Sequence, residues 1–291
     1  MLKEWREDMV DRKRFLGGTD IAAILGLSKY KTALYVWAIK TGQIEPVDDD
    51  ALHKKLGKRL EEVVAELFTE KTGKRVIRAN AYRIHRKHDF LCAQIDRLVV
   101  GEDALLECKT TSSFGVKEWD GDEIPADYIA QVMFQLAITG RAVGYIACLI
   151  GNHKFVWKEI KRDPVMIAEM VKRAVDFWEN YVIPKIPPAG LTAKDKETLA
   201  LLYPTAEIGS EITLEDDIVK LIESRNALRQ DSIQIGKEID RVENEIKMAM
   251  KSHEIGITGP WRVLWRNQKR KEFMVPATEF RKFEIKPNKE A

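Results

Sequence analysis

The chain has 291 residues, of which 45% are apolar and 32% charged, and its formal net charge at pH 7 is +2. This balance is typical of a globular protein with a heavily charged surface. The longest apolar stretches are too short to cross a bilayer, so we expect no transmembrane helix and no secretory signal. The three cysteines lack C-x-x-C spacing, which argues against a zinc or iron–sulfur site and favours reduced thiols in a cytoplasmic protein.

The net charge decides little, but its distribution leaves nucleic-acid binding open. Residues 74–89 and 261–271 are basic with aromatic residues between the charges, whereas acidic residues are concentrated in 45–50 and 211–217. Basic stretches on a nearly neutral protein suit a phosphate backbone. Strands with lysine and arginine on one solvated face would give the same pattern.

The N-terminal part of the chain is predicted to be helical. A Gly17–Gly18 turn precedes a short helix that Thr19 can cap, and Thr32 can cap a second helix that ends at Gly42. A long helix is predicted from about residue 51 to residue 71. Its expected apolar stripe consists of Leu56, Leu60, Val63, Val64 and Leu67.

The middle of the chain alternates between strand and helix patterns. Three strands are predicted first, at about 75–84, 89–100 and 103–110, the last two joined by a tight "GED" turn. A helix at 126–139, two strands around "GNHK" and a helix that ends at Pro184 follow. This order predicts an α/β fold with a mixed central sheet between helices.

The stretch "PKIPPAG" is predicted to be a linker, which divides the chain into residues 1–190 and 191–291. Apolar residues recur at heptad spacing from about 214 to 252, which indicates a coiled-coil-like helical appendage. It is either an antiparallel helical hairpin or one long helix packing on a partner. The basic stretch "GPWRVLWR" after it is predicted to be a short strand.

The strand predicted at 103–110 carries an acid and a lysine two residues apart. Because strand side chains alternate between faces, Glu107 and Lys109 share one face. A buried ion pair rarely repays its desolvation, so a purely structural role is energetically weak. If the preceding strand is an antiparallel neighbour, Asp96 lies near Glu107. Two converging carboxylates need a cation, oxygen ligands favour Mg²⁺ or Mn²⁺, and Lys109 could steer or deprotonate a water for phosphodiester hydrolysis.

The predicted helices supply further polar groups. Glu61 lies at the flank of the apolar stripe, from which it can add a ligand or hold a metal-bound water, whereas Glu62 points to solvent. The helix at 126–139 places Tyr128, Gln131 and Gln135 together, either as boundary residues or as hydrogen-bond partners of phosphate or water. A bare D…E-x-K pattern is more often structural than catalytic, so the residues alone leave both interpretations open.

Five segments, in this order, resemble a known family: "FLGGTDIAAILGLSKYKT", "GKRLEEVVAELF", "QIDRL", "LLECKTT" and "YIAQVMFQLAITG". They are similar to the YqaJ-type viral recombinases, phage and prophage exonucleases like lambda exonuclease with the PD-(D/E)-X-K nuclease fold. The resemblance covers about residues 10–185. It implies a Mg²⁺-dependent exonuclease that degrades the 5′ strand of linear double-stranded DNA and leaves 3′ tails for recombination by strand annealing. It also implies a ring-shaped homotrimer, a single-strand annealing protein as partner and a cytoplasmic location in a bacterial host.

The resemblance carries over to individual catalytic residues. Asp96, Glu107 and Lys109 fall on the nuclease triad, Glu61 on the helical acid of the "GK-x-x-E" motif, and Gln131 on the glutamine of the "AQ" motif. It implies Mg²⁺, for which Mn²⁺ can substitute, with two ions per site. The expected metal ligands are Asp96, Glu107, the backbone carbonyl of Cys108 and, through water, Glu61.

The DNA end is expected to bind near the first helix. Thr19 occupies the hydroxyl position of the family's "GGSD" motif, and Arg12 or Arg14 the arginine expected near the 5′ phosphate. An arginine can donate two hydrogen bonds to phosphate at once, and a helix N-terminus adds free N–H donors. Tyr128 and Gln135 are expected to contact DNA as well.

Two departures and three alternatives remain. Ile95 replaces the family's usual proline before the aspartate, and the chain after about residue 190 has no counterpart in the minimal family member. The alternatives are a PD-(D/E)-X-K endonuclease, a RecB-like nuclease, and a non-catalytic DNA-binding scaffold for a recombinase. RecB-like domains favour Gln-x-x-x-Tyr in the helix that here carries Gln131 and Gln135.

Overall fold

The computed structural model describes residues 4–6, 11–46, 52–79, 81–119, 121, 123–269, 283 and 285. Residues 47–50, which include the three aspartates of the acidic stretch, and the basic residues 270 and 271 therefore lie outside the described part. The chain forms two compact units, Met1–Tyr203 and Pro204–Ala291. Among the described residues, no helix has the length and apolar character needed to span a membrane.

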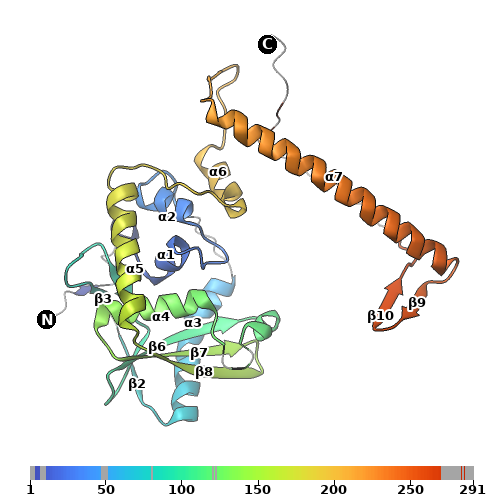
Figure 1. Ribbon diagram of the computed structural model, residues 1–291. Helices are drawn as coiled ribbons and strands as arrows, with labels where there is room; N and C mark the ends of the chain where they lie inside the picture. The colour runs from blue at the N-terminus through green and yellow to red at the C-terminus, as the bar shows by residue number, and fades with distance from the viewer. Residues whose placement is uncertain are drawn as a thin grey trace. The chain divides into compact units, whose positions relative to one another are not determined.

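A five-stranded mixed sheet forms the centre of the first unit (Figure 1). Its order is β2-β5-β6-β7-β8, with β6 and β7 parallel and the other neighbours antiparallel. The predicted antiparallel pairing before and after the "GED" turn is confirmed, with Arg97 opposite Leu106. The strands are β2 Val76–Arg78, β5 Arg97–Val99, β6 Ala104–Thr111, β7 Val143–Ile150 and β8 Lys154–Lys161.

Two predicted strands were drawn too long, because the chain changes sheets within each. A second, three-stranded sheet joins β1 (Glu4–Arg6), β3 (Ala81–Ile84) and β4 (Cys92–Gln94). The predicted run 75–84 is thus divided between β2 and β3, and 89–100 between β4 and β5. Asp96 lies between β4 and β5; its backbone carbonyl accepts from the Ala79 N–H at 3.4 Å, and its side chain is turned toward the Cys108 N–H of β6.

Helices cover both faces of the central sheet (Figure 1). One core cluster lies between the sheet and four helices, and a second lies between the sheet and a single long helix, α3, Leu52–Thr72. The predicted helix at 126–139 is confirmed at both ends, since Pro125 precedes it and Gly140 follows with a φ of 77°. The four helices are α1 Gly18–Ile24, α2 Ala33–Lys40, α4 Ala126–Thr139 and α5 Pro164–Phe177, the last continued by the π-helical turn Trp178–Val182.

The caps of the first two helices differ from each other. Thr32 caps α2 as predicted, with its Oγ1 accepting from the Tyr35 backbone N–H at 3.2 Å. Thr19 does not cap α1; it lies inside the first turn, and Gly17 is the N-cap residue. Asp20 Oδ2 accepts from the Gly17 N–H at 3.0 Å, which leaves the Thr19 hydroxyl exposed beside the helix start.

The buried face of α3 is rotated from the predicted stripe. Leu56 and Val63 are exposed, whereas Val64, Ala65 and Phe68 are buried. Phe68 sets this face, because its ring packs against Tyr145 and Trp157 at centroid distances of 5.4 and 6.0 Å. Glu61, three and four residues before Val64 and Ala65, consequently lies on the side of α3 that faces the sheet.

The first unit ends after Tyr203 rather than after Gly190. A 3-10 turn, Ala193–Asp195, and a short helix that was not predicted, α6 Lys196–Leu202, complete it. Lys194 Nζ donates to the Ser28 carbonyl at 2.9 Å, and Leu202 packs against the core. These long-range contacts hold the segment to α1 and α2, so it belongs to the folded unit.

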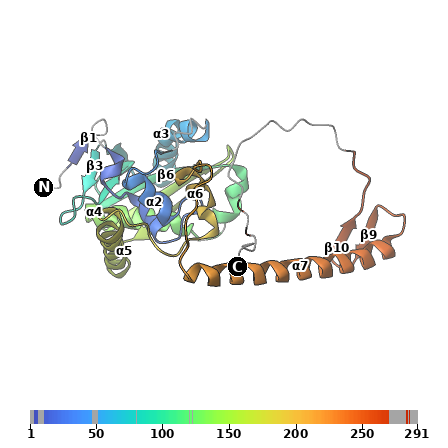
Figure 2. The ribbon, with the colours of Figure 1, turned by 90° about the horizontal axis from the view of Figure 1, so that it is seen from above.

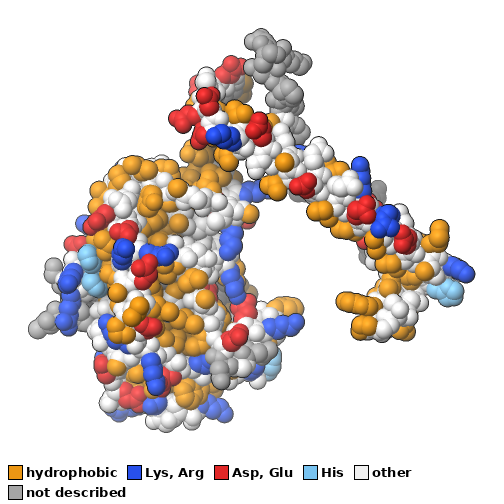
Figure 3. Space-filling model, viewed as in Figure 1, with side chains coloured by type: hydrophobic (Ala, Val, Ile, Leu, Met, Phe, Trp, Pro, Cys, Tyr) orange, Lys and Arg blue, Asp and Glu red, His pale blue; other side chains and the backbone are white. Residues whose placement is uncertain are grey.

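The second unit consists of one long helix and a β-hairpin (Figure 2). α7 runs from Asp217 to Met250 as a single helix, which excludes the alternative of a helical hairpin. The predicted strand at "GPWRVLWR" is confirmed as β10, Trp261–Leu264, paired with β9, Ile255–Thr258, which was not predicted. Apolar side chains of the heptad pattern are exposed along α7, among them Leu221, Leu228, Ile235, Ile239 and Val242 (Figure 3).

A chain ending at Tyr203 is expected to fold and to lose a protein contact. Its thermal unfolding should stay cooperative, whereas a chain ending at Gly190 exposes the core under α6 and should unfold at lower temperature. Because the heptad face of α7 suits a helical partner, the shorter chain should form smaller particles or gain solubility relative to the full chain. Light scattering measures the particle mass. If the full chain and the chain ending at Tyr203 have the same number of protomers per particle and the same solubility, α7 has no role in protein contact.

Candidate active site

Two carboxylates lie near each other at β6, with Glu107 buried and Asp96 partly buried. Asp96 Oδ2 accepts a hydrogen bond from the Cys108 N–H at 2.8 Å, so the side chain takes the place of a ladder partner beyond the end of β5. Glu107, one residue earlier on β6, is 3% exposed. Because the N–H and C=O of a strand residue point to the same side, the Cys108 carbonyl lies on the side of Asp96. This edge therefore gathers carboxylate and carbonyl oxygens.

Three donors from β6 and α4 hold Glu107. Its Oε1 accepts from Lys109 Nζ at 2.6 Å and from Gln131 Nε2 at 2.5 Å, and its Oε2 accepts from Gln135 Nε2 at 2.6 Å. Lys109 Nζ also donates to Gln131 Oε1 at 2.9 Å and lies over the Tyr128 ring, 5.1 Å from its centroid. Hydrogen bonds thus join the side chains of β6 and the polar side of α4 into one connected network.

Burial and neighbouring carboxylates disfavour negative charge on the acids of this network. Burial, followed by the charge of Glu107, raises the pKa of Asp96 well above its usual value. Burial also raises the pKa of Glu61; Arg97 opposes this rise and Glu107 adds to it. For Lys109, burial acts to lower the pKa, but the charge and hydrogen bond of Glu107 outweigh burial, so the pKa is raised. Lys109 is therefore an ammonium cation in this state.

A hard divalent cation fits this arrangement in charge and in donor chemistry. Burial and Glu107 raise the pKa of Asp96, so a cation bound beside it would favour its ionised form, and oxygen donors without histidine suit Mg²⁺ or Mn²⁺. No three His, Cys, Asp or Glu side chains in the described part of the chain are already arranged around an ion position. The oxygens of Glu107 are held by Lys109, Gln131 and Gln135, so an ion on Glu107 must share or displace a donor.

Glu62 is exposed, as predicted, and it also forms ion pairs with two arginines. Its Oε2 accepts from Arg97 Nη2 at 3.1 Å and from Arg78 Nε at 3.0 Å. Arg97 is 4% exposed and also donates to the Asp96 carbonyl at 2.8 Å. Sequence reasoning did not single out Arg97, although it directly follows Asp96 in "QIDR". It fixes the backbone of Asp96 and places a charge near Glu61.

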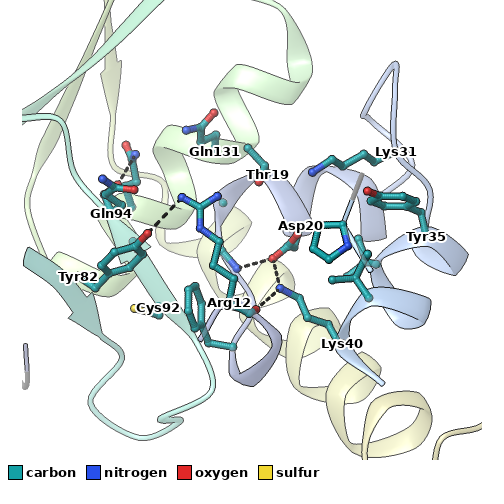
Figure 4. Close-up of a pocket in the computed structure, with 18 residues that line it drawn as sticks. Arg12, Thr19, Asp20, Lys31, Tyr35, Lys40, Tyr82, Cys92, Gln94 and Gln131 are labelled. Carbon is teal, nitrogen blue, oxygen red and sulfur yellow. Dashed lines mark hydrogen bonds and ion pairs between the residues drawn. The ribbon is translucent and has the colours of Figure 1, made fainter. Parts of the chain in front are cut away.

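A pocket of about 250 Å³ lies beside this network (Figure 4). Arg12, Thr19, Lys31 and Gln131 are among the residues that line it. Arg12 Nη2 donates to Tyr82 Oη at 3.3 Å, which aims the guanidinium across the pocket. The pocket therefore combines cationic groups with a hydroxyl and the start of α1.

The protein residues predicted to bind the DNA end do not all lie in the pocket. Both arginines are exposed, but Arg12 lines the pocket and Arg14 does not. Gln135 borders the pocket but is 2% exposed, and both of its N–H bonds are used, by Glu107 and by the Gln94 carbonyl at 3.1 Å. It has no donor left for phosphate. We therefore assign it to positioning Glu107 rather than to DNA contact. Tyr128 packs under Lys109.

Two lysines of the pocket were missed from the sequence. Lys40 Nζ pairs with Asp20 Oδ2 at 2.7 Å and donates to the Arg12 carbonyl at 2.8 Å, which ties α2 to the start of α1. Lys31 lines the pocket from the turn before α2. The sequence signal that could have identified Lys31 is its place in "SKYKT", a turn between two predicted helices, because such a turn places its side chains near the ends of both helices.

Gly18 brings the pocket and the carboxylate network into contact. A Cβ at this position would lie 2.8 Å from Gln131 Cγ and 3.3 Å from the Gln131 carbonyl oxygen. Only glycine permits so close an approach of α1 to α4. Gln131 therefore borders the pocket on one side and holds Glu107 on the other.

The part of the chain that carries this site is similar to known proteins. Residues 4–142, which include every residue of the network and the pocket discussed above, match the family described as the YqaJ-like viral recombinase domain. An uncharacterized protein YqaJ of Bacillus subtilis (strain 168) is 36% identical over 267 residues, which are 90% of this chain and 82% of that relative.

Two solved structures share the fold. The alkaline exonuclease LHK-Exo from Laribacter hongkongensis superposes with a TM-score of 0.50 and 17% identity, over 60% of this chain and 91% of that chain. The structure of LHK-Exo in complex with dAMP gives a TM-score of 0.51 and 19% identity over the same shares. The first unit thus has the lambda-exonuclease-like PD-(D/E)-X-K fold, as predicted.

Proposed function

The chain belongs to the YqaJ-like viral recombinase family, and from this membership and its site we propose that it is a metal-dependent 5′-to-3′ exonuclease of linear double-stranded DNA. The observation that carries the proposal is the contact between a buried acid–lysine network and a cationic pocket through Gly18 and Gln131. A nuclease that starts at DNA ends needs a group that holds the end and a group that cleaves, at a fixed distance from each other. The fold of the alkaline exonuclease LHK-Exo supports the same activity.

We assign the metal to Asp96, Glu107 and the Cys108 carbonyl, with Glu61 acting through water. Mg²⁺ is the proposed ion, with Mn²⁺ as a substitute and two ions per site. Bound there, the metal would lower the pKa of a water and neutralise charge on the phosphate. Gln131 and Gln135 fix the orientation of Glu107 by their hydrogen bonds. Glu107 is thereby kept in place before substrate arrives.

We assign Lys109 to charge stabilisation rather than to proton removal. Its raised pKa keeps the ammonium charged, and a cation cannot accept a proton. A fixed positive group beside the scissile phosphate stabilises the charge that develops on phosphate oxygens. Because the site is partly shielded from water, such a group acts more strongly than it would in solution.

The pocket is proposed to bind the terminal 5′ phosphate. Arg12 supplies a planar fork of donors, Lys31 a second charge, and Thr19 a hydroxyl at the start of α1. A phosphate held there would set which bond reaches the carboxylate network. Digestion would then proceed from 5′ ends and leave 3′ single-stranded tails, the substrate of a strand-annealing protein in phage-type recombination. A ring-shaped homotrimer and such an annealing partner remain part of the proposal.

Incubation of the protein with Mg²⁺ and DNA of different topology tests the proposal. Linear duplex should be lost and covalently closed duplex should persist, with label on the 5′ ends released first. Loss of both substrates would indicate an endonuclease or a RecB-like nuclease. Binding without any loss would indicate a scaffold. Release of label from 3′ ends first would contradict the assigned polarity.

The 5′-phosphate pocket predicts a preference that one arginine controls. Linear duplex with 5′ phosphates should be digested at least about tenfold faster than the same duplex with 5′ hydroxyls, because a charge-assisted bidentate contact contributes about 1.5–3 kcal/mol. Arg12→Ala should erase this preference and spare slow digestion of the hydroxyl end. Arg14→Ala, outside the pocket, is the matched control and should keep the preference. Equal rates on both ends in the unmodified protein would exclude the pocket.

A further inference from the structure

The β-hairpin of the second unit has the composition of a nucleic-acid contact. The fifteen residues 255–269 contain Arg262, Arg266 and Lys269, two tryptophans and no acidic residue. A segment of this length with only positive charges is attracted to phosphate and repelled by basic partners. It is not part of the carboxylate network or of the pocket described above.

The hairpin is anchored, and its tryptophans are nevertheless exposed. Gly256 lies against Met250 at the end of α7, with an added Cβ 3.7 Å from Met250 Cγ, and the Trp265 N–H donates to the Glu254 carbonyl at 3.0 Å. Met250 is buried under it. Trp261 is 71% and Trp265 48% exposed. Apolar side chains on the hairpin are visible in Figure 3.

The side chains alternate along β10 in a way that separates rings from charges. Trp261 and Val263 share one face of the strand, and Arg262 and Leu264 share the other, since strand side chains alternate. Trp265 follows directly after the strand, with Arg266 next to it. Each exposed indole is followed in sequence by an arginine, and alternation turns Arg262 to the face opposite Trp261. Rings on one face of a narrow two-stranded hairpin and guanidinium groups on the other suit a strand that stacks its bases on the rings and passes its phosphates along the edge.

We propose that this hairpin binds single-stranded nucleic acid, with Trp261 and Trp265 stacking on bases and Arg262, Arg266 and Lys269 contacting phosphates. An intact duplex hides the faces of its bases, so exposed indoles favour an unpaired strand. A protein partner is less well matched, because an apolar contact would not require a segment free of acidic residues. The inference goes beyond the proposed exonuclease and does not depend on it.

Fluorescence anisotropy with a labelled oligo-dT 20-mer tests the proposal on the full chain, in EDTA so that the strand is not digested. Replacing both tryptophans with leucine (W261L/W265L) keeps apolar bulk but removes stacking, and it should weaken binding by at least about tenfold. Replacing both with phenylalanine (W261F/W265F) keeps a π-face and should retain most of the affinity. Leu228→Ala, an exposed apolar change on α7, is the matched control and should have no effect.

The salt dependence of binding tests the arginines separately. R262Q/R266Q should reduce the slope of log affinity against log salt by about 1.4, since each phosphate contact on a single strand contributes about 0.7. If the leucine variant binds oligo-dT as the unmodified chain does, the proposal is overturned. If that variant instead changes only the particle mass, the hairpin is a protein contact and the proposal is equally overturned. The two proposals can fail separately. If the unmodified chain digests no DNA but binds oligo-dT, and the leucine variant loses that binding, the exonuclease proposal is refuted and the hairpin proposal is supported.

Discussion

Asp96→Asn is expected to abolish DNA cleavage at every Mg²⁺ concentration, a loss of about 10³-fold or more, in the range of one essential electrostatic group. The asparagine keeps the shape of Asp96, and its oxygen can still accept from the Cys108 N–H. It removes the charge that a metal would need. Activity of the variant and of the unmodified protein is compared on 5′-phosphorylated linear duplex.

The same substitution should leave the fold intact or make it more stable. Burial and Glu107 raise the pKa of Asp96 in the folded chain, so the folded state binds a proton more tightly than the unfolded state does. The stability that Asp96 contributes is fully present below its pKa in the unfolded chain. It is lost as pH rises through its pKa in the folded chain. Without metal at neutral pH, the Asn variant should therefore unfold at an equal or higher temperature. Added Mg²⁺ should raise the unfolding temperature of the unmodified protein and not that of the variant.

Near-normal turnover in a folded Asp96→Asn protein would contradict the metal assignment. So would an equal rise in unfolding temperature with Mg²⁺ in both proteins. Glu62→Gln provides a control outside the carboxylate network, since Glu62 binds Arg78 and Arg97 rather than Lys109. It should retain the Mg²⁺-dependent rise.

The central strand of the site could be predicted because its pattern is local. Alternation along β6 fixes Glu107 and Lys109 on one face, and the four-residue connection 100–103 between β5 and β6 leaves few ways to place Asp96. The α4 helix was equally accessible, because Pro125 and Gly140 mark its ends in the sequence. Local rules of this kind need no knowledge of distant residues.

Contacts between distant segments could not be predicted in the same way. The buried face of α3 is decided by Phe68 packing on Tyr145 and Trp157, which lie far along the chain. The partners of Gln135 were hidden from the sequence for the same reason. An amide on a helix has no preferred partner in sequence, and only the fold shows that Glu107 and Gln94 use its donors.

The pocket at the start of α1 could be predicted from the sequence only in part. The "GGTD" pattern indicates a helix start, but it does not distinguish Arg12 from Arg14, which are two residues apart. The 3-10 turn at Arg12–Arg14 separates them, because it sends one side chain toward Tyr82 and leaves the other in solvent. Short turns of this kind lack the periodicity on which sequence prediction depends.

Lys109→Met should lower the single-turnover cleavage rate by about 10²-fold or more, as expected for one catalytic group that acts on developing charge. Methionine keeps an unbranched stem against the Tyr128 ring and removes the ammonium. Affinity for DNA in Ca²⁺, which supports binding without cleavage, should change little. A rapid-quench experiment gives the rate, and anisotropy gives the affinity.

The metal response separates Lys109 from Asp96. Lys109 Nζ lies 2.6 Å from Glu107 Oε1, where it competes with an ion for that oxygen. Removing it should therefore preserve or increase the rise in unfolding temperature with Mg²⁺, whereas Asp96→Asn should lose that rise. If affinity for DNA falls as far as the rate, Lys109 is a phosphate contact only. If the Mg²⁺ response is lost together with the rate, Lys109 maintains the metal site rather than stabilising charge, because its ammonium then serves mainly to hold Glu107 in place.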